Sequence, residues 1–153
     1  MRIILGFVLA LSVSGIACAG IRDDTAALSN ETAAAISNYM AAWADVKPVN
    51  CRAGADMGER LAHDMVGAVQ QLSDELTDPL LDATHQFVMR ESLAGVAPYA
   101  AQGQLYLADG YTKARCFAKA RQAYQVVLDT FTTDGDEVYR KHAQSSLQQL
   151  PPE

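Results

Sequence analysis

Glu59 and His63 have the spacing of a metal site, since they lie one helical turn apart. A carboxylate and an imidazole at positions i and i+4 of a helix can bind one divalent ion. A zinc site needs three or four protein ligands, however, and no second histidine stands at helical spacing from His63. An exposed i,i+4 pair is the favoured interpretation, and we expect neither a bound metal nor a cofactor.

A second group with possible chemistry is an acidic segment that crosses a predicted helix junction. It consists of Asp74, Glu75, Asp78, Asp82 and His85. Two carboxylates with separated pKa values can act as acid and base, but a helix N-terminus attracts acidic residues through its dipole alone. We interpret this segment as capping and surface charge. Ser-x-x-Lys, Gly-x-Ser-x-Gly and glycine-rich phosphate-loop motifs do not occur in the sequence, so we expect no enzyme.

The charge of the chain argues against an anionic partner. The 153 residues carry a formal net charge of −6, and the single local basic run is Lys113, Arg115, Lys119 and Arg121. Such a run is usually a solvated helix face. We therefore expect no nucleic acid partner, and a membrane only through a covalent lipid.

The N-terminus predicts export. Met1 and Arg2 give a positive start, and residues 3–13 form an apolar run that is too short to cross a bilayer. Ala17-Cys18-Ala19 fits the small-x-small pattern that signal peptidase accepts. We expect a signal peptide over residues 1–19, a single domain over residues 20–153, and a periplasmic or secreted protein.

Cys18 leaves an alternative open. Cleavage before it would give a lipoprotein signal over residues 1–17 and a lipidated N-terminus. Gly15-Ile16-Ala17-Cys18 resembles a bacterial lipoprotein box at its last three positions and departs from it at Gly15. Release after Ala19 is favoured, and lipidation of Cys18 remains the alternative.

Cys51 and Cys116 remain after either cleavage. In an oxidising compartment a structural disulfide between them is the favoured interpretation, over a metal pair or a reactive thiol. The loop that they would close holds 64 residues between the two cysteines. Closing a loop of this length in the unfolded chain stabilises the fold by roughly 4 kcal/mol.

Hydrophobic periodicity predicts an all-α body of antiparallel helical hairpins, because alanine is abundant and no strand-like alternation persists. Helices are expected over about residues 23–46, 55–76, 98–111 and 136–150. A further apolar stripe predicts a helix over Phe117, Ala120, Tyr124, Val127, Leu128 and Phe131. Residues 132–136 are predicted to form the loop before the last helix.

Another helix is expected to begin at Asp78 as N-cap and Pro79 as its first residue. Its apolar side would consist of Leu80, Thr84, Phe87 and Val88. Gly95 and Pro98 predict a break or kink before the helix at 98–111.

Residues 104–133 resemble a tetratricopeptide repeat, a helix pair of about 34 residues. Leu107, Ala108 and Tyr111 match its first helix, and Ala120, Tyr124 and Val127 match its second. The repeat's terminal proline is missing at Thr132, Arg115 or Cys116 occupies a turn position that favours glycine, and one copy is visible. An ordinary helical hairpin would give the same pattern.

The resemblance implies a protein that acts by binding a protein or peptide partner on a helical surface. Tyr111, Arg121 and Tyr124 are the expected partner-binding residues. The alternative function is that of a lipid-anchored envelope assembly factor, similar to the small helical lipoproteins, and it depends on Cys18.

Overall fold

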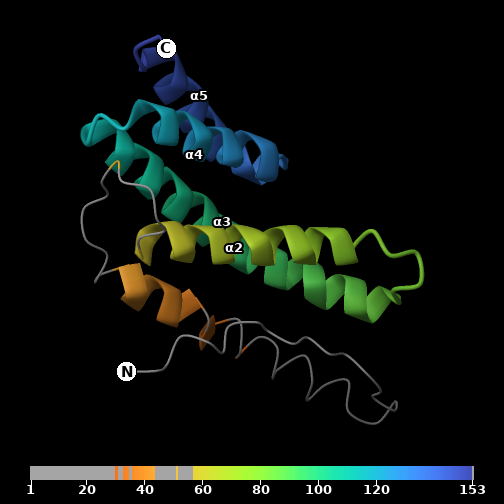
Figure 1. The fold of residues 1–153 in the computed structure, drawn as a ribbon. Helices are drawn as coiled ribbons and strands as arrows, with labels where there is room; N and C mark the ends of the chain where they lie inside the picture. Colours follow the sequence, from red (N-terminus) through yellow and green to blue (C-terminus); the bar gives the residue numbers. More distant parts are fainter. Residues whose placement is uncertain (1–29, 31–32, 35, 44–50, 52–56, 153) are drawn as a thin grey trace.

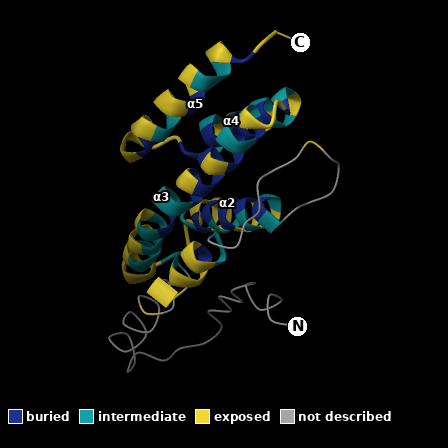
Figure 2. Ribbon diagram, turned by 90° about the vertical axis from the view of Figure 1, so that its left-hand side faces the viewer, coloured by how far each residue is buried: buried dark blue, intermediate teal, exposed yellow. Residues whose placement is uncertain are grey.

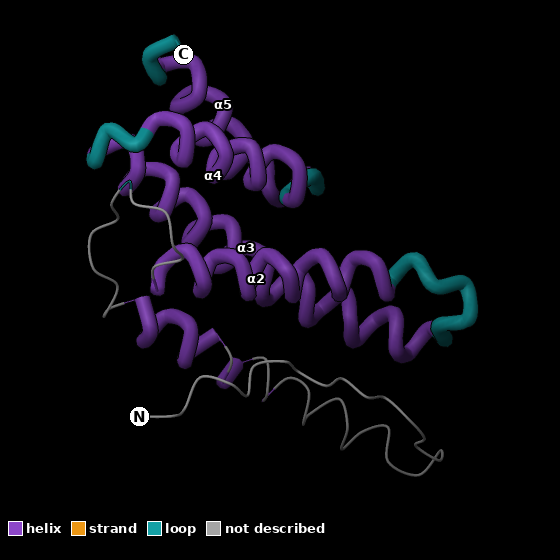
Figure 3. Tube along the Cα trace, viewed as in Figure 1, coloured by secondary structure: helices purple, strands orange, loops and turns teal. Residues whose placement is uncertain are grey.

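The computed structural model describes residue 30 and residues 33–34, 36–43, 51 and 57–152, and it is all-α over that part of the chain. The predicted fold class is therefore confirmed. Residues 36–43 are helical. The later helices are α2 (Met57–Glu75), α3 (Ala83–Lys113), α4 (Phe117–Thr130), the 3₁₀ helix η1 (Asp134–Asp136) and α5 (Glu137–Gln149). Figure 3 shows that loops account for the rest of the described chain.

α3 is the central element. α2 and α3 form one antiparallel hairpin, and α4 turns back across the C-terminal half of α3 to form a second (Figure 1). α5 packs on α4 and also reaches α3. Consequently α3 is covered by α2 over one part of its length and by α4 and α5 over another, which explains why its apolar residues do not follow one stripe.

Small residues let these helices approach one another closely. Side chains that are fully buried (0 % exposed) are Ala62, Ala100, Ala101, Ala108, Ala120, Val127 and Ala143. The larger members of the core, Tyr124 and Phe131, fill the space between the α3–α4 hairpin and its neighbours and are 1 % exposed. Figure 2 shows the resulting dark, buried strip where the helices face one another. The stripe predicted for α4 is confirmed as its buried side.

The predicted start of the third helix at Asp78 and Pro79 was wrong. The Asp78 carboxylate instead accepts a hydrogen bond from the Leu80 backbone N–H at 2.9 Å, which closes a local turn. The helix begins four residues later, where Asp82 is the N-cap and accepts from the N–H groups of Thr84 and His85 at 2.9 and 3.0 Å. Asp82 therefore accepts from two N–H groups of the first helical turn that have no partner within the helix, whereas Asp78 accepts from one N–H group of a turn.

Of the break or kink predicted at Gly95 and Pro98, the break does not occur, because α3 is a single helix of 31 residues that includes both. Pro98 lacks the N–H that would bond the carbonyl of Ala94, and Ala94 is exposed, so water can satisfy that carbonyl. Val96 and Ala100, which flank the proline, are buried. Packing on both sides of Pro98 therefore holds the helix together.

The apolar side predicted around Leu80 and Phe87 does not face the core. Leu80 is 90 % exposed and Phe87 is 64 % exposed. Leu80 lies in the α2–α3 loop and Phe87 in the first turns of α3, beyond the part of α3 that α4 covers (Figure 1). Apolar character alone therefore did not bury these side chains.

The helix at 36–43 packs on α3 where Gly103 leaves room. A Cβ atom placed on Gly103 would lie 1.8 Å from the Tyr39 hydroxyl oxygen, so only glycine permits this approach. Burial raises the pKa of Tyr39 to about 12. Trp43 meets the exposed ring of Tyr106 edge-on, with the ring centroids 5.2 Å apart. The rest of the helix predicted over 23–46 lies outside the described residues, apart from the helical residue 30 and residues 33–34.

The last connection is more ordered than the loop predicted over 132–136. Thr133 and Asp136 form a reciprocal capping box around η1: the Asp136 backbone N–H donates to the Thr133 side chain, and the Thr133 backbone N–H donates to the Asp136 carboxylate at 3.2 Å. The Thr133 hydroxyl also donates to this carboxylate at 2.6 Å. Arg140 of α5 donates to the Phe131 carbonyl at 2.9 Å. These bonds fix the start of α5 against the end of α4. Among the described helices, none combines the length and apolar character that crossing a membrane requires.

Candidate functional site

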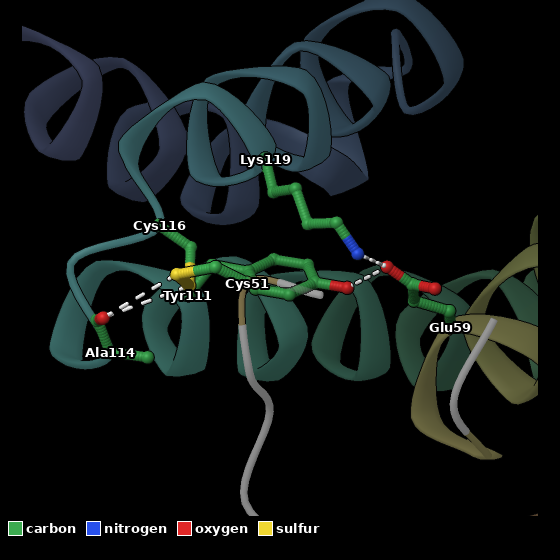
Figure 4. Close-up of a disulfide and its surroundings, with 6 residues drawn as sticks. All are labelled: Cys51, Glu59, Tyr111, Ala114, Cys116 and Lys119. Atoms are coloured by element: carbon green, nitrogen blue, oxygen red, sulfur yellow. Dashed lines mark hydrogen bonds and ion pairs between the residues drawn. A yellow bond between two sulfur atoms is a disulfide. The ribbon is translucent and has the colours of Figure 1, made fainter. Parts of the chain in front are cut away.

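The predicted disulfide is present. Cys51 and Cys116 are joined by an S–S bond of 1.98 Å, with a Cα–Cα distance of 5.1 Å. Cys51 is exposed, whereas Cys116 is 5 % exposed and occupies the N-cap position of α4. The bond therefore fixes residue 51 to the α3–α4 turn (Figure 4).

A polar triad joins three helices beside this disulfide. The Glu59 carboxylate of α2 accepts a hydrogen bond from the Tyr111 hydroxyl of α3. The same carboxylate forms an ion pair with the Lys119 ammonium of α4, at 2.5 Å (Figure 4). The Lys119 ammonium also lies 5.0 Å from the centroid of the Tyr111 ring. Glu59 and Lys119 side chains are 23 % and 25 % exposed, so solvent screens the pair only in part. The triad fixes the register of α2 against the α3–α4 hairpin.

A second polar cluster lies between α3, α4 and α5. The Tyr124 hydroxyl donates to Asp109 Oδ1 at 2.6 Å, and His142 Nε2 lies 3.1 Å from the same oxygen. Thr112 Oγ1 lies 3.3 Å from the Tyr124 hydroxyl. Burial raises the pKa of Tyr124, and the hydrogen bond to Asp109 adds to the effect. Tyr124 therefore remains a neutral donor near pH 7 and holds Asp109 at the edge of α5.

Two of the three expected partner-binding residues are core residues. Tyr111 is 2 % exposed and Tyr124 is 1 % exposed, and both hydroxyls bond carboxylates of neighbouring helices. The expectation that these rings lie at a contact surface is corrected by their burial. Arg121 is half-buried and donates to the backbone carbonyl of Pro151, so it holds the C-terminal segment against α4. Cys18 lies outside the described residues.

The residues with possible metal or acid–base chemistry are not brought together. Glu59 turns to Tyr111 and Lys119, while the His63 side chain is 89 % exposed. Asp82 and His85 form a local pair at 2.5 Å, and the bond from the His85 backbone N–H is the main cause that lowers the pKa of Asp82. Among the residues that the structure describes, no three His, Cys, Asp or Glu side chains gather as metal ligands. Capping accounts for Asp82.

An open polar depression of about 390 Å³ lies between the end of α2 and the end of α4. Its lining consists of Gln70, Ser73, Asp74, Asp129 and Thr130. Ligand pockets are mostly apolar and bury their ligand, and this depression offers neither property. It therefore supplies no substrate site.

Sequence reasoning missed the roles of Glu59 and Asp109. Glu59 precedes buried Ala62 and Val66 by three and seven positions, so it lies on the apolar stripe of α2. Asp109 follows buried Leu105 by four positions on α3. A carboxylate on an apolar stripe needs a partner when the stripe is buried, and that signal was present in the sequence.

Exposed residues of α3 lie beside the second polar cluster. Gln102 Nε2 lies 3.5 Å from the Tyr139 hydroxyl of α5, and Tyr106 packs against Trp43 of the 36–43 helix. Both Gln102 and Tyr106 are exposed. This α3 face (Gln102, Tyr106, Asp109, Tyr139 and His142) thus combines aromatic, amide and ionisable groups on two adjacent helices.

Comparison with protein-family models, curated proteins and solved structures found no match. The function must therefore be argued from the residues of this chain.

Proposed function

We propose that the chain is an exported, disulfide-bonded helical protein that binds a protein or peptide partner on its α3 face. The observation that carries the proposal is the contact of α5 with α3 through Gln102–Tyr139 and Asp109–His142, at 3.5 and 3.1 Å. This contact places polar and aromatic side chains of α3 and α5 next to one another. Tyrosine provides large contact area at low entropic cost, which suits protein recognition.

The tetratricopeptide resemblance supports the proposal in part. Residues 104–133 contain a helical hairpin in which Ala108 and Ala120 are fully buried, a feature that a tetratricopeptide repeat shares with ordinary helical hairpins. α5 lies beside both members of that hairpin, as the first helix of a following pair would. α3 departs from the pattern, since its 31 residues exceed half of a 34-residue pair.

Site-specific photo-crosslinking tests this proposal. A photoreactive residue at Gln102 is expected to capture the same partner as one at Tyr106 in an envelope extract of the native host. Gln122 on α4 is the matched control, because it is an exposed glutamine outside the α3 face. Equal capture at Gln102 and Gln122, or capture at neither Gln102 nor Tyr106, contradicts the proposal.

A lipid-anchored envelope assembly factor is the second candidate, and Ala17-Cys18 is the observation that favours it. The intact mass of the mature protein separates the two candidates. An N-terminus at Gly20 favours release, whereas a diacylated or triacylated Cys18 favours the tether.

A further inference from the structure

The two cysteines of the disulfide differ in exposure, although both sulfur atoms lie 3.7 Å from the Ala114 carbonyl oxygen. Cys51 is exposed, and the neighbouring Cys116 is 5 % exposed against the core. Cys116 also precedes α4 as its N-cap, whereas Cys51 is in a bend outside the described helices. Figure 4 shows the bond at the α3–α4 turn, with Tyr111 of the Glu59–Tyr111–Lys119 triad beside it.

This asymmetry bears on thiol–disulfide exchange. An external thiolate attacks one sulfur while the other leaves with the electron pair, and the choice depends on access and on the stability of the leaving thiolate. Access favours attack on Cys51, because its exposed side faces solvent. Attack on Cys116 is hindered, because that residue is only 5 % exposed.

The leaving group favours the same direction. The backbone N–H groups of the first turn of α4 have no partners within the helix, and they carry partial positive charge. A thiolate at a helix N-terminus is stabilised by these groups. The charged residues near Cys116 in sequence are Lys113 and Arg115 before it and Lys119 in the first turn of α4, which pairs with Glu59. The Ala114 carbonyl oxygen lies 3.7 Å from Cys116 Sγ and disfavours the thiolate. Burial disfavours a thiolate, and the helix terminus with its excess of cations opposes that effect.

We propose that the Cys51–Cys116 bond is a directional thiol-exchange site, in which an external thiolate is captured on Cys51 and Cys116 leaves. The sulfur of the external thiol forms a bond to Cys51 Sγ as the Cys51–Cys116 bond breaks. Cys116 Sγ takes the electron pair and becomes a thiolate. The external thiol is thereby oxidised to a mixed disulfide, Cys116 is reduced, and residue 51 is released from the α3–α4 turn.

The incoming thiol can come from a small molecule or from a dithiol reductase, since the chemistry at Cys51 is the same. In one arm of the test, the oxidised full chain is mixed with reduced glutathione, quenched in acid at early times and blocked with N-ethylmaleimide. Peptide mapping is expected to find glutathione on Cys51 and maleimide on Cys116, in roughly tenfold excess over the reverse pattern. Peptides that contain Cys18 are separated in the same map.

In the second arm, a thioredoxin-type reductase that lacks its resolving cysteine replaces glutathione. It is expected to be trapped on Cys51, and the faster arm identifies the source of the thiol. Adducts on Cys116 in equal or greater amount overturn the proposal in either arm. A folded chain whose disulfide neither reagent opens overturns it as well.

Single-cysteine chains give an independent measurement. With Cys18→Ser also present in both chains, the ultraviolet absorbance of the thiolate is followed against pH in Cys51→Ser, which retains Cys116, and in Cys116→Ser, which retains Cys51. Cys116 is expected to ionise at the lower pH. The reverse order overturns the assigned leaving group, and the wild-type mapping decides the question where either variant does not fold.

Discussion

The two hairpins that share α3 differ in how far some of their apolar side chains are exposed. In the α3–α4 hairpin, Tyr124 and Phe131 are each 1 % exposed, and a disulfide ties its turn to Cys51. At the tip of the α2–α3 hairpin, Leu80 and Phe87 are 90 % and 64 % exposed. The difference shows that burial follows from the helix that lies opposite a side chain, and composition alone does not decide it.

The largest expected effect comes from removal of the disulfide at the α3–α4 turn. The Cys51→Ser, Cys116→Ser double variant is expected to lose about 4 kcal/mol of unfolding free energy, because the unfolded chain regains the entropy of an open loop. Chemical denaturation followed by circular dichroism measures the loss. A change below about 1 kcal/mol would show that the unfolded chain is little constrained by this bond.

Matched leucines test the comparison directly. Leu107→Ala, at a residue that is 4 % exposed, is expected to cost about 3 kcal/mol through lost burial and a cavity. Leu80→Ala, at a residue that is 90 % exposed, is expected to change stability by less than about 0.5 kcal/mol. Equal losses in denaturation experiments would place Leu80 in a packed environment and remove the contrast between the hairpins.

Pro98 lies in α3 between the two hairpins, and its replacement sharpens the comparison. Pro98→Ala is expected to stabilise the protein by about 1–2 kcal/mol, because a helix hydrogen bond is restored and part of the gain is offset by the freer unfolded chain. The thermal midpoint should rise. A lower midpoint would indicate that the shape of α3 at Pro98 is needed for packing on α2 and α4.

The smallest effect is expected at the N-cap of α3. Hydrogen bonds from the His85 backbone and side chain lower the pKa of Asp82, so the ionised form stabilises this end above the ordinary aspartate pKa. That stabilisation is lost as the pH falls through the lowered pKa of Asp82. Hydrogen exchange at the Thr84 and His85 amides, corrected for the intrinsic slowing of amide exchange in acid, should accelerate on acidification, and in Asp82→Ala at neutral pH. Asp78→Ala is the control, and an equal acceleration there would contradict the assignment of the cap.

Much of the fold was predictable from local patterns. The stripe from Phe117 to Phe131 identified the buried side of α4, and paired cysteines in a chain with an export-type N-terminus indicated the disulfide. The errors arose where tertiary structure decides. Asp78 and Asp82 are both good caps in sequence, and Pro98 is tolerated because packing on its two sides holds α3.

The candidate site was less predictable than the fold. Tyr111 and Tyr124 were expected at a surface. Instead, the Tyr111 hydroxyl donates to Glu59, 52 positions away in the sequence, and the Tyr124 hydroxyl donates to Asp109, 15 positions away. Periodicity identifies which face of a helix is apolar. It does not identify the hydrogen-bond partner of a tyrosine hydroxyl at the end of a buried side chain. The α3 face became apparent only when the contacts of α5 were known.

The disulfide also makes the described chain a covalent ring with two tails. α2, the α2–α3 loop and α3 all lie between Cys51 and Cys116. A protease that cuts once in the exposed stretch Thr77–Leu80 therefore leaves a single molecule whose halves separate only after reduction. A cut in the exposed stretch Thr132–Gly135 releases α5 as a separate chain, whether or not the bond is intact. Nicking the same molecule at two places thus gives opposite results on a non-reducing gel.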